Sequence, residues 1–142
     1  MLVSTDTRRV IQRWKAVFVF FVIHQVEEVV LSLPAWRAHV TLPGWAAFTD
    51  HSLMYALPSR SVTALFVAGQ CLLLASLAYL LRASDRATRL AQSALLLVLM
   101  VAFAVHIALS VATHTVMPGV FTSVFPGLPV GGYLLYTRWR NA

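Results

Sequence analysis

The sequence predicts an all-α integral membrane protein, a compact bundle of four transmembrane helices with an interfacial amphipathic segment between the first two. Two observations support this fold class. Of the 142 residues, 59% are hydrophobic and 11% are charged, whereas a soluble domain is nearer half apolar and a quarter charged. The apolar residues also gather into runs of about 18 residues or more, long enough to cross a bilayer as helices. The length suits a single membrane domain over residues 1–142.

The first predicted span follows a basic N-terminal stretch, and Pro34 is expected to end it. We expect this run to be retained rather than cleaved as a signal peptide, because no small-residue cleavage site follows it. The next segment mixes prolines and tryptophans with scattered polar groups, which is typical of a membrane interface. Prolines inside the last apolar run predict a kinked or broken helix. The predicted spans are 16–33, 61–81, 90–113 and 119–136, and the interfacial segment is 34–60.

The basic residues predict the orientation of the spans. Four Lys and Arg lie in residues 1–15, three in 82–89 and two in 138–140, against two in 34–60. Cytoplasmic loops carry the excess of basic residues, so we expect both termini on the cytoplasmic side of a bacterial cytoplasmic membrane. This placement also accounts for the net charge of +6, and no nucleic acid partner is expected. The single cysteine, Cys71, excludes an internal disulfide.

One polar stretch interrupts the first span: His24-Gln25-Val26-Glu27-Glu28. A charged side chain at bilayer depth costs at least ~2.5–3.5 kcal/mol, so such residues face the bundle interior and need partners, protons or a metal. Residues i, i+3 and i+4 share a helix face, and we therefore expect His24, Glu27 and Glu28 to point together into the bundle.

Further candidates follow from depth in the predicted topology. At ~1.5 Å per residue, His106 of the third span falls at the depth of the two glutamates, and Gln70 lies near the midplane. Pro118 is suited to begin the fourth helix, whose free N–H groups, with Gly119, would hold an anionic or carbonyl group of a substrate. The candidate catalytic residues are Glu27, Glu28, His24 and His106, and the candidate substrate contacts are Gln70, Pro118, Gly119 and His51.

The chemistry of these residues stays open between three hypotheses. His24, Glu27, Glu28 and His106 suit one divalent transition metal, Zn, Fe or Mn. Without a metal, one of two adjacent carboxylates would stay protonated, and an acid beside a base suits isomerisation or cyclisation. The third hypothesis is a hydrogen-bond network that only joins the spans.

We expect an enzyme that acts on a lipid-like or other apolar small molecule from the bilayer. The rival classes are a proton- or cation-coupled transporter that works as a homo-oligomer, and a structural subunit of a membrane complex.

The order of these motifs resembles a known family. His24-x-x-Glu27-Glu28 in the first span, then His106, then Pro118-Gly119 are similar to the HXXEE family of small bacterial membrane proteins, which carries a Tyr-x-Pro-Gly motif at the last position. Here Val116 stands where that tyrosine would be. If the tyrosine hydroxyl has a role, Thr115 or Tyr133 would have to supply it. The function of the family is not established, so the resemblance implies a site and names no reaction.

Overall fold

The computed structural model describes residues 5–51, 57–81 and 83–140, and every regular element in those ranges is helical. This confirms the all-α prediction. In chain order the helices are α1 (Thr5–Val30), α2 (Leu33–His39), the 3-10 helix η1 (Gly44–His51), α4 (Arg60–Leu81), α5 (Asp85–Thr113), α6 (Val120–Thr122), the π-helical turn η2 (Ser123–Gly127) and α7 (Leu128–Arg140).

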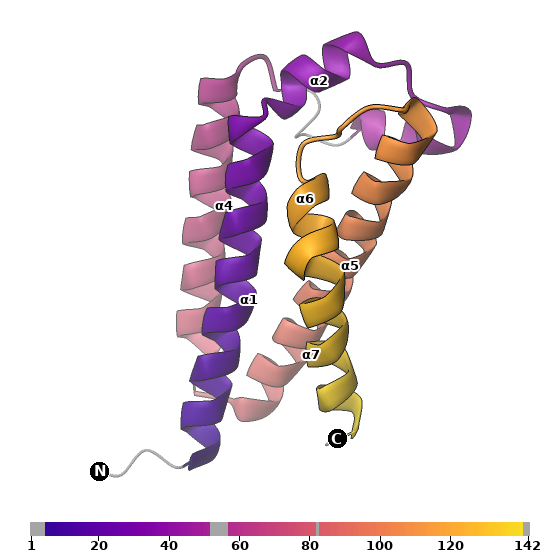
Figure 1. The fold of residues 1–142 in the computed structure, drawn as a ribbon. Coiled ribbons are helices and arrows are strands. Elements are labelled where there is room, and N and C mark those ends of the chain that lie inside the picture. Colours follow the sequence, from indigo (N-terminus) through magenta and orange to yellow (C-terminus); the bar gives the residue numbers. More distant parts are fainter. Residues whose placement is uncertain (1–4, 52–56, 82, 141–142) are drawn as a thin grey trace.

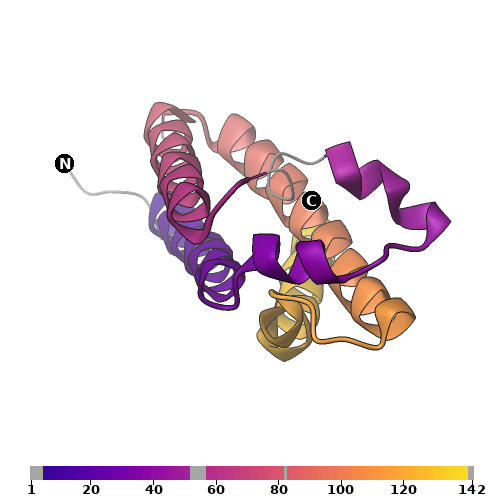
Figure 2. The same cartoon turned by 90° about the horizontal axis from the view of Figure 1, so that it is seen from above.

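The long helices run roughly along one direction (Figure 1). α1 lies beside α4, and α5 packs against both α1 and α7. The start of α1, the connection between α4 and α5 and the end of α7 lie at one end of the molecule. α2 and η1 lie across the opposite end, as the view from above shows (Figure 2). The turn before α6 lies at that same end.

Two helices, α4 and α5, are long and apolar enough to cross a membrane. A third span exists if α1, from Trp14, and α2 are counted together, although they meet at a bend of 52°. These two or three helices are compatible with a membrane protein, while a bundle of four spans is not confirmed. The fourth predicted run is broken into α6, η2 and α7. Phe125 leaves the helical conformation there (φ −131, ψ 106), because the residue before a proline, here Pro126, is pushed towards extended backbone.

The end of the first predicted span is corrected by the structure. α1 stops at Val30, and Ser32 then adopts a left-handed conformation with φ 56. Pro34 does not end the helix but lies in the first turn of α2, where its missing N–H and fixed φ are tolerated. The predicted interfacial segment contains two short helices, α2 and η1, and residues 52–56 of that segment lie outside the described residues.

Apolar packing holds α1, α5 and the C-terminal helices around one polar centre. One cluster of buried side chains joins Val17 of α1 to Leu96, Leu99 and Phe103 of α5. A second joins Leu33, Ala46, Leu109 and Met117, and so ties α2, η1 and the turn before α6 to α5. Because His106 lies one turn from Phe103 and one turn from Leu109 on α5, it is placed between the two clusters.

Candidate functional site

Two histidines and one glutamate meet inside the protein, and we call them the His–Glu–His cluster: His24 and Glu28 of α1 and His106 of α5. Their exposed fractions are 2%, 4% and 6%. Nε2 of His106 lies 3.2 Å from Glu28 Oε1, and Nε2 of His24 lies 3.6 Å from the same oxygen. The spacing i, i+4 stacks His24 and Glu28 on one face of α1. The three side chains can offer ligand atoms that lie within 4.8 Å of one another.

The far side of each imidazole ring has a fixed hydrogen-bond partner. His106 Nδ1 lies 2.7 Å from the carbonyl oxygen of Pro118. A carbonyl only accepts, so Nδ1 carries the proton of the neutral ring and Nε2 keeps its lone pair. His24 Nδ1 lies 2.8 Å from Thr122 Oγ1, and the Thr122 hydroxyl donates to Gly119 O at 3.2 Å. With its own proton on Gly119 O, Thr122 Oγ1 accepts from His24 Nδ1, and in this tautomer His24 Nε2 is unprotonated as well.

Two ring lone pairs and a carboxylate oxygen thus face one another. Three acceptors at this spacing repel unless a proton or a metal cation lies among them. The second oxygen, Glu28 Oε2, is buried and has no hydrogen-bond partner in the part of the chain that the structure describes. An unpartnered buried carboxylate oxygen is costly, so the cluster is suited to hold either a proton or a cation.

Ring contacts hold the two imidazoles at an angle to each other. The centroids of His24 and His106 are 4.8 Å apart with an edge-to-face tilt of 60°. Phe103 also packs edge-to-face against His24, with the ring centroids 4.9 Å apart. Edge-to-face geometry is a favoured arrangement of aromatic rings, and here it limits rotation of His24 away from Glu28.

Glu27 does not join the cluster, although the sequence suggested that it would act with Glu28. Its Oε1 accepts the backbone N–H groups of Gly119 and Phe121, both at 3.0 Å, and its Oε2 accepts that of Thr122 at 2.8 Å. Adjacent residues on an α-helix point about 100° apart, which lets the two glutamates serve different partners. Glu27 caps the start of α6 from across the molecule.

The segment around Pro118 and Gly119, which the sequence predicted to hold a substrate group, binds Glu27 instead. The Gly119 N–H, which the sequence suggested for a substrate group, is taken by Glu27. Pro118 does not begin the helix, because α6 starts at Val120. Gly119 has φ +92, and a Cβ there would lie 2.6 Å from His106 Cε1 and 2.7 Å from His24 Cε1. Only glycine tolerates both the positive φ and the lack of room for a Cβ at this position.

Among the described residues, the structure records no contact between the cluster and the remaining predicted residues. Gln70 is partly buried on α4, and its Oε1 has no hydrogen-bond partner among the described residues. His51 ends η1, but its side chain lies outside the described residues. Val116, at the position of the family tyrosine, is 58% exposed, so this departure removes no group from the cluster. Tyr133 is 66% exposed on α7.

Sequence reasoning missed Thr122 and Phe103. Thr122 follows the Pro-Gly pair by three residues, and Phe103 precedes His106 by three, a spacing that places Phe103 near His106 on one helix face. That spacing was the available signal for Phe103. Nothing in the sequence marks the Thr122 hydroxyl, because its role depends on how the broken helix turns back towards α1.

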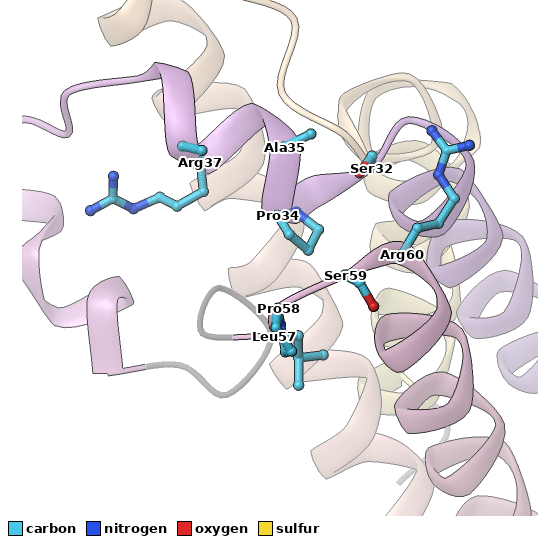
Figure 3. A pocket seen from close by; sticks show the side chains of 9 residues that line it. Ser32, Pro34, Ala35, Arg37, Leu57, Pro58, Ser59 and Arg60 are labelled. Atoms are coloured by element: carbon cyan, nitrogen blue, oxygen red, sulfur yellow. The ribbon is translucent and has the colours of Figure 1, made fainter.

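A cavity of about 460 Å³ lies elsewhere, between α2 and the start of α4. Ser32, Pro34 and Pro58 line it (Figure 3). The side chains of Arg37 and Arg60 extend away from each other on its two sides. The cavity shares no residue with the His–Glu–His cluster, so the chemistry of the cluster is not explained by this opening.

Residues 15–134 match a family described as a protein of unknown function with HXXEE motif. The match covers most of the chain and includes α1 from Lys15 onward, α5 and the turn before α6. The chain therefore belongs to the HXXEE family. No curated protein and no solved structure matches the chain significantly.

Proposed function

We propose that the His–Glu–His cluster is the centre of an intramembrane enzyme that binds one divalent transition metal and acts on an apolar small molecule from the bilayer. The convergence of two imidazole Nε2 atoms on one buried carboxylate oxygen carries this proposal. Two histidines and one carboxylate form catalytic zinc sites and the facial triad of non-haem iron enzymes. Metal-bound histidine usually has a hydrogen-bond partner on its other ring nitrogen, as both rings have here.

The spacing of the cluster is compatible with metal ligation. Bonds of ~2.0–2.2 Å to a metal place two ligand atoms no more than about 4.4 Å apart. The three candidate atoms already lie within 4.8 Å of one another, so small side-chain shifts suffice. Three protein ligands leave a position for water or a substrate oxygen, and a bound metal would polarise that substrate or activate that water. We favour Zn, Fe or Mn because imidazole and carboxylate suit these ions.

The surroundings of the cluster favour an apolar substrate. Phe103 packs against the His24 ring, and Ile23 and Val26, exposed by 46% and 51%, lie on the face of α1 that points away from the cluster. In a bilayer Ile23 and Val26 would face lipid, and an apolar molecule dissolved in the bilayer is the substrate class that such a protein would meet. We propose that the protein lies in the bacterial cytoplasmic membrane with both termini inside, since nine of its eleven basic residues lie in residues 1–15, 82–89 and 138–140. The start of α1, the start of α5 and the end of α7 lie at one end of the molecule (Figure 1).

Acid–base chemistry without a metal is the second candidate. The 3.2 Å between Glu28 Oε1 and His106 Nε2 is within reach of a shared proton. A protonated Glu28 would donate to His106 and act as the acid in an isomerisation or cyclisation. A proton-coupled transporter, working as a homo-oligomer, would use the same residues as a relay.

The first test is elemental analysis of the detergent-purified protein, with an affinity tag that contains no histidine. Wild type should contain about one transition metal ion per chain. Glu28→Gln and His106→Ala should lose it, because each removes one of three ligands. His39→Ala is the matched control, since this histidine is exposed and bonds only to Ala35 O among the contacts recorded for it. A folded wild type that stays metal-free after incubation with Zn, Fe and Mn salts would overturn the metal proposal.

The second test concerns enzyme activity. Mass spectrometry would compare lipid extracts of cells that express wild type, Glu28→Gln or His39→Ala. An enzyme predicts at least one apolar species that changes with wild type and His39→Ala but not with Glu28→Gln. Identical extracts from cells with fully loaded wild type and with Glu28→Gln would refute an activity on membrane-resident apolar molecules.

A further inference from the structure

We propose that Glu27 is a positioning residue that fixes the ring tautomers of both cluster histidines. It acts through the segment of residues 117–123, which we call the Pro-Gly turn. The inference rests on the proposed function in taking the His–Glu–His cluster as the reacting centre, but it does not require a metal. It gives the two adjacent glutamates different tasks.

The first step is the anchorage of the Pro-Gly turn. Glu27 binds its backbone through the N–H groups of Gly119, Phe121 and Thr122, at 3.0, 3.0 and 2.8 Å. The other end is tied to α5, where the Met117 N–H donates to Ser110 Oγ at 3.0 Å. Glu27 is thus the link that the structure records between α1 and the backbone N–H groups of this turn.

The second step is that the same turn supplies both acceptors for the histidines. Pro118 O accepts from His106 Nδ1, and Thr122 Oγ1 accepts from His24 Nδ1. Between them, Gly119 O accepts from the Thr122 and Ser123 hydroxyls and from the Ser123 N–H. The two acceptors therefore belong to one hydrogen-bonded unit, and a shift of that unit moves both.

The third step concerns the proton on each ring. While Pro118 O and Thr122 Oγ1 are in place, Nδ1 carries the proton and Nε2 is free to bind a cation or take a proton from Glu28. If the turn leaves α1, both acceptors are displaced and the opposite tautomer becomes accessible. A ring protonated at Nε2 offers no lone pair to the centre. Glu27 therefore controls the centre without touching it.

A purely structural cap would behave differently. Loss of such a cap would lower the melting temperature but leave the ring tautomers of the folded protein unchanged. The position of the ring protons is the readout that separates the two roles, because ¹⁵N NMR distinguishes protonated from unprotonated imidazole nitrogens. It needs neither a substrate nor a metal.

The experiment uses full-length metal-free protein with ¹⁵N-labelled histidine, at alkaline pH where imidazole is neutral. Signals are assigned with single His→Ala variants of the other three histidines, His39, His51 and His114. Wild type should show protonated Nδ1 and bare Nε2 for both His24 and His106. Glu27→Ala should shift both rings towards the Nε2-protonated form, and Glu27→Gln, which keeps one acceptor oxygen, should do so less.

Thr122→Val and Thr122→Ser form a matched pair that leaves Glu27 intact. Valine removes the acceptor for His24 alone, so only the His24 ring should change. Serine keeps the hydroxyl and should preserve the wild-type pattern. This pair keeps the proposal testable if Glu27→Ala does not fold.

Metal titration gives a second readout. A partner outside the ligand shell typically changes metal affinity by ~10–100-fold, and we expect that loss in Glu27→Gln, whereas Glu28→Gln should show no binding. Folded Glu27→Ala or Glu27→Gln with both rings as in wild type, or Thr122→Val with an unchanged His24 ring, would overturn the positioning role. The expected tautomers in a wild type that binds no metal would instead refute the metal proposal and leave Glu27 as the positioning residue.

Discussion

Gly119→Ala is the substitution that the structure constrains most tightly. The residue has φ +92, where an alanine is strained, and its new Cβ would lie 2.6 Å from His106 Cε1 and 2.7 Å from His24 Cε1. The left-handed backbone costs about 1–2 kcal/mol, and overpacking of a filled site costs about 1–3 kcal/mol. The sum is roughly 2–5 kcal/mol. The rings cannot yield freely, because their Nδ1 atoms are bound to the same turn.

The assay is thermal unfolding of the purified protein in detergent, with Gly69→Ala as the matched control. Gly119→Ala should lower the melting temperature by on the order of 10 °C. Gly69 lies within α4, and a Cβ there would meet nothing within 4 Å, so alanine should stabilise that helix by up to about 1 kcal/mol. If Gly119→Ala melts at or above the wild-type temperature, the packing of the turn against the two rings is refuted.

Three further predictions concern stability. A chelator should lower the melting temperature of metal-loaded wild type but not of Glu28→Gln. A ligand at 100 times its Kd adds about 2.7 kcal/mol to the free energy of unfolding, and the chelator removes that contribution. Equal shifts in the two proteins would contradict the metal site. Phe103→Leu should destabilise the protein by at least ~0.5–1.5 kcal/mol through the lost ring contact with His24, and equilibrium unfolding would measure this. Ser84→Ala should lower the free energy of unfolding by an amount near the lower end of ~0.5–2 kcal/mol, because the hydrogen bond from the Ala87 N–H to the Ser84 side chain is long at 3.3 Å. Ser84→Asp, which keeps an acceptor oxygen at this N-cap, should leave the stability near that of wild type.

The sequence was sufficient to find the members of the cluster but not their partners. Helical spacing placed His24 and Glu28 on one face, and the depth argument selected His106 from another helix. The same spacing rule also included Glu27, because i, i+3 and i+4 span a wide arc. Which part of that arc faces α5 and which faces the Pro-Gly turn depends on how the helices are rotated against each other.

Pro34 shows a second limit of sequence reasoning. A proline after an apolar run is compatible with the end of one helix or with the first turn of the next. The choice was set by Ser32, whose left-handed backbone lets α2 start at Leu33. Serine has no strong preference for that conformation, so the residue type does not predict it.

The three motifs of the family form one unit in physical terms. Two unprotonated Nε2 atoms in neutral rings need a hydrogen-bond acceptor at each Nδ1 atom. One acceptor is the Pro118 carbonyl, and the other is the Thr122 hydroxyl, and the irregular backbone at Pro118 and Gly119 brings both to the rings. Irregular backbone in an apolar setting leaves N–H groups that must be satisfied within the protein. Glu27 accepts three of them. The glutamate beside Glu28 thus supports the orientation of the histidines. The single variants Glu27→Gln and Glu28→Gln should therefore differ in their defects: the first should change the ring tautomers, and the second should remove a group of the cluster itself.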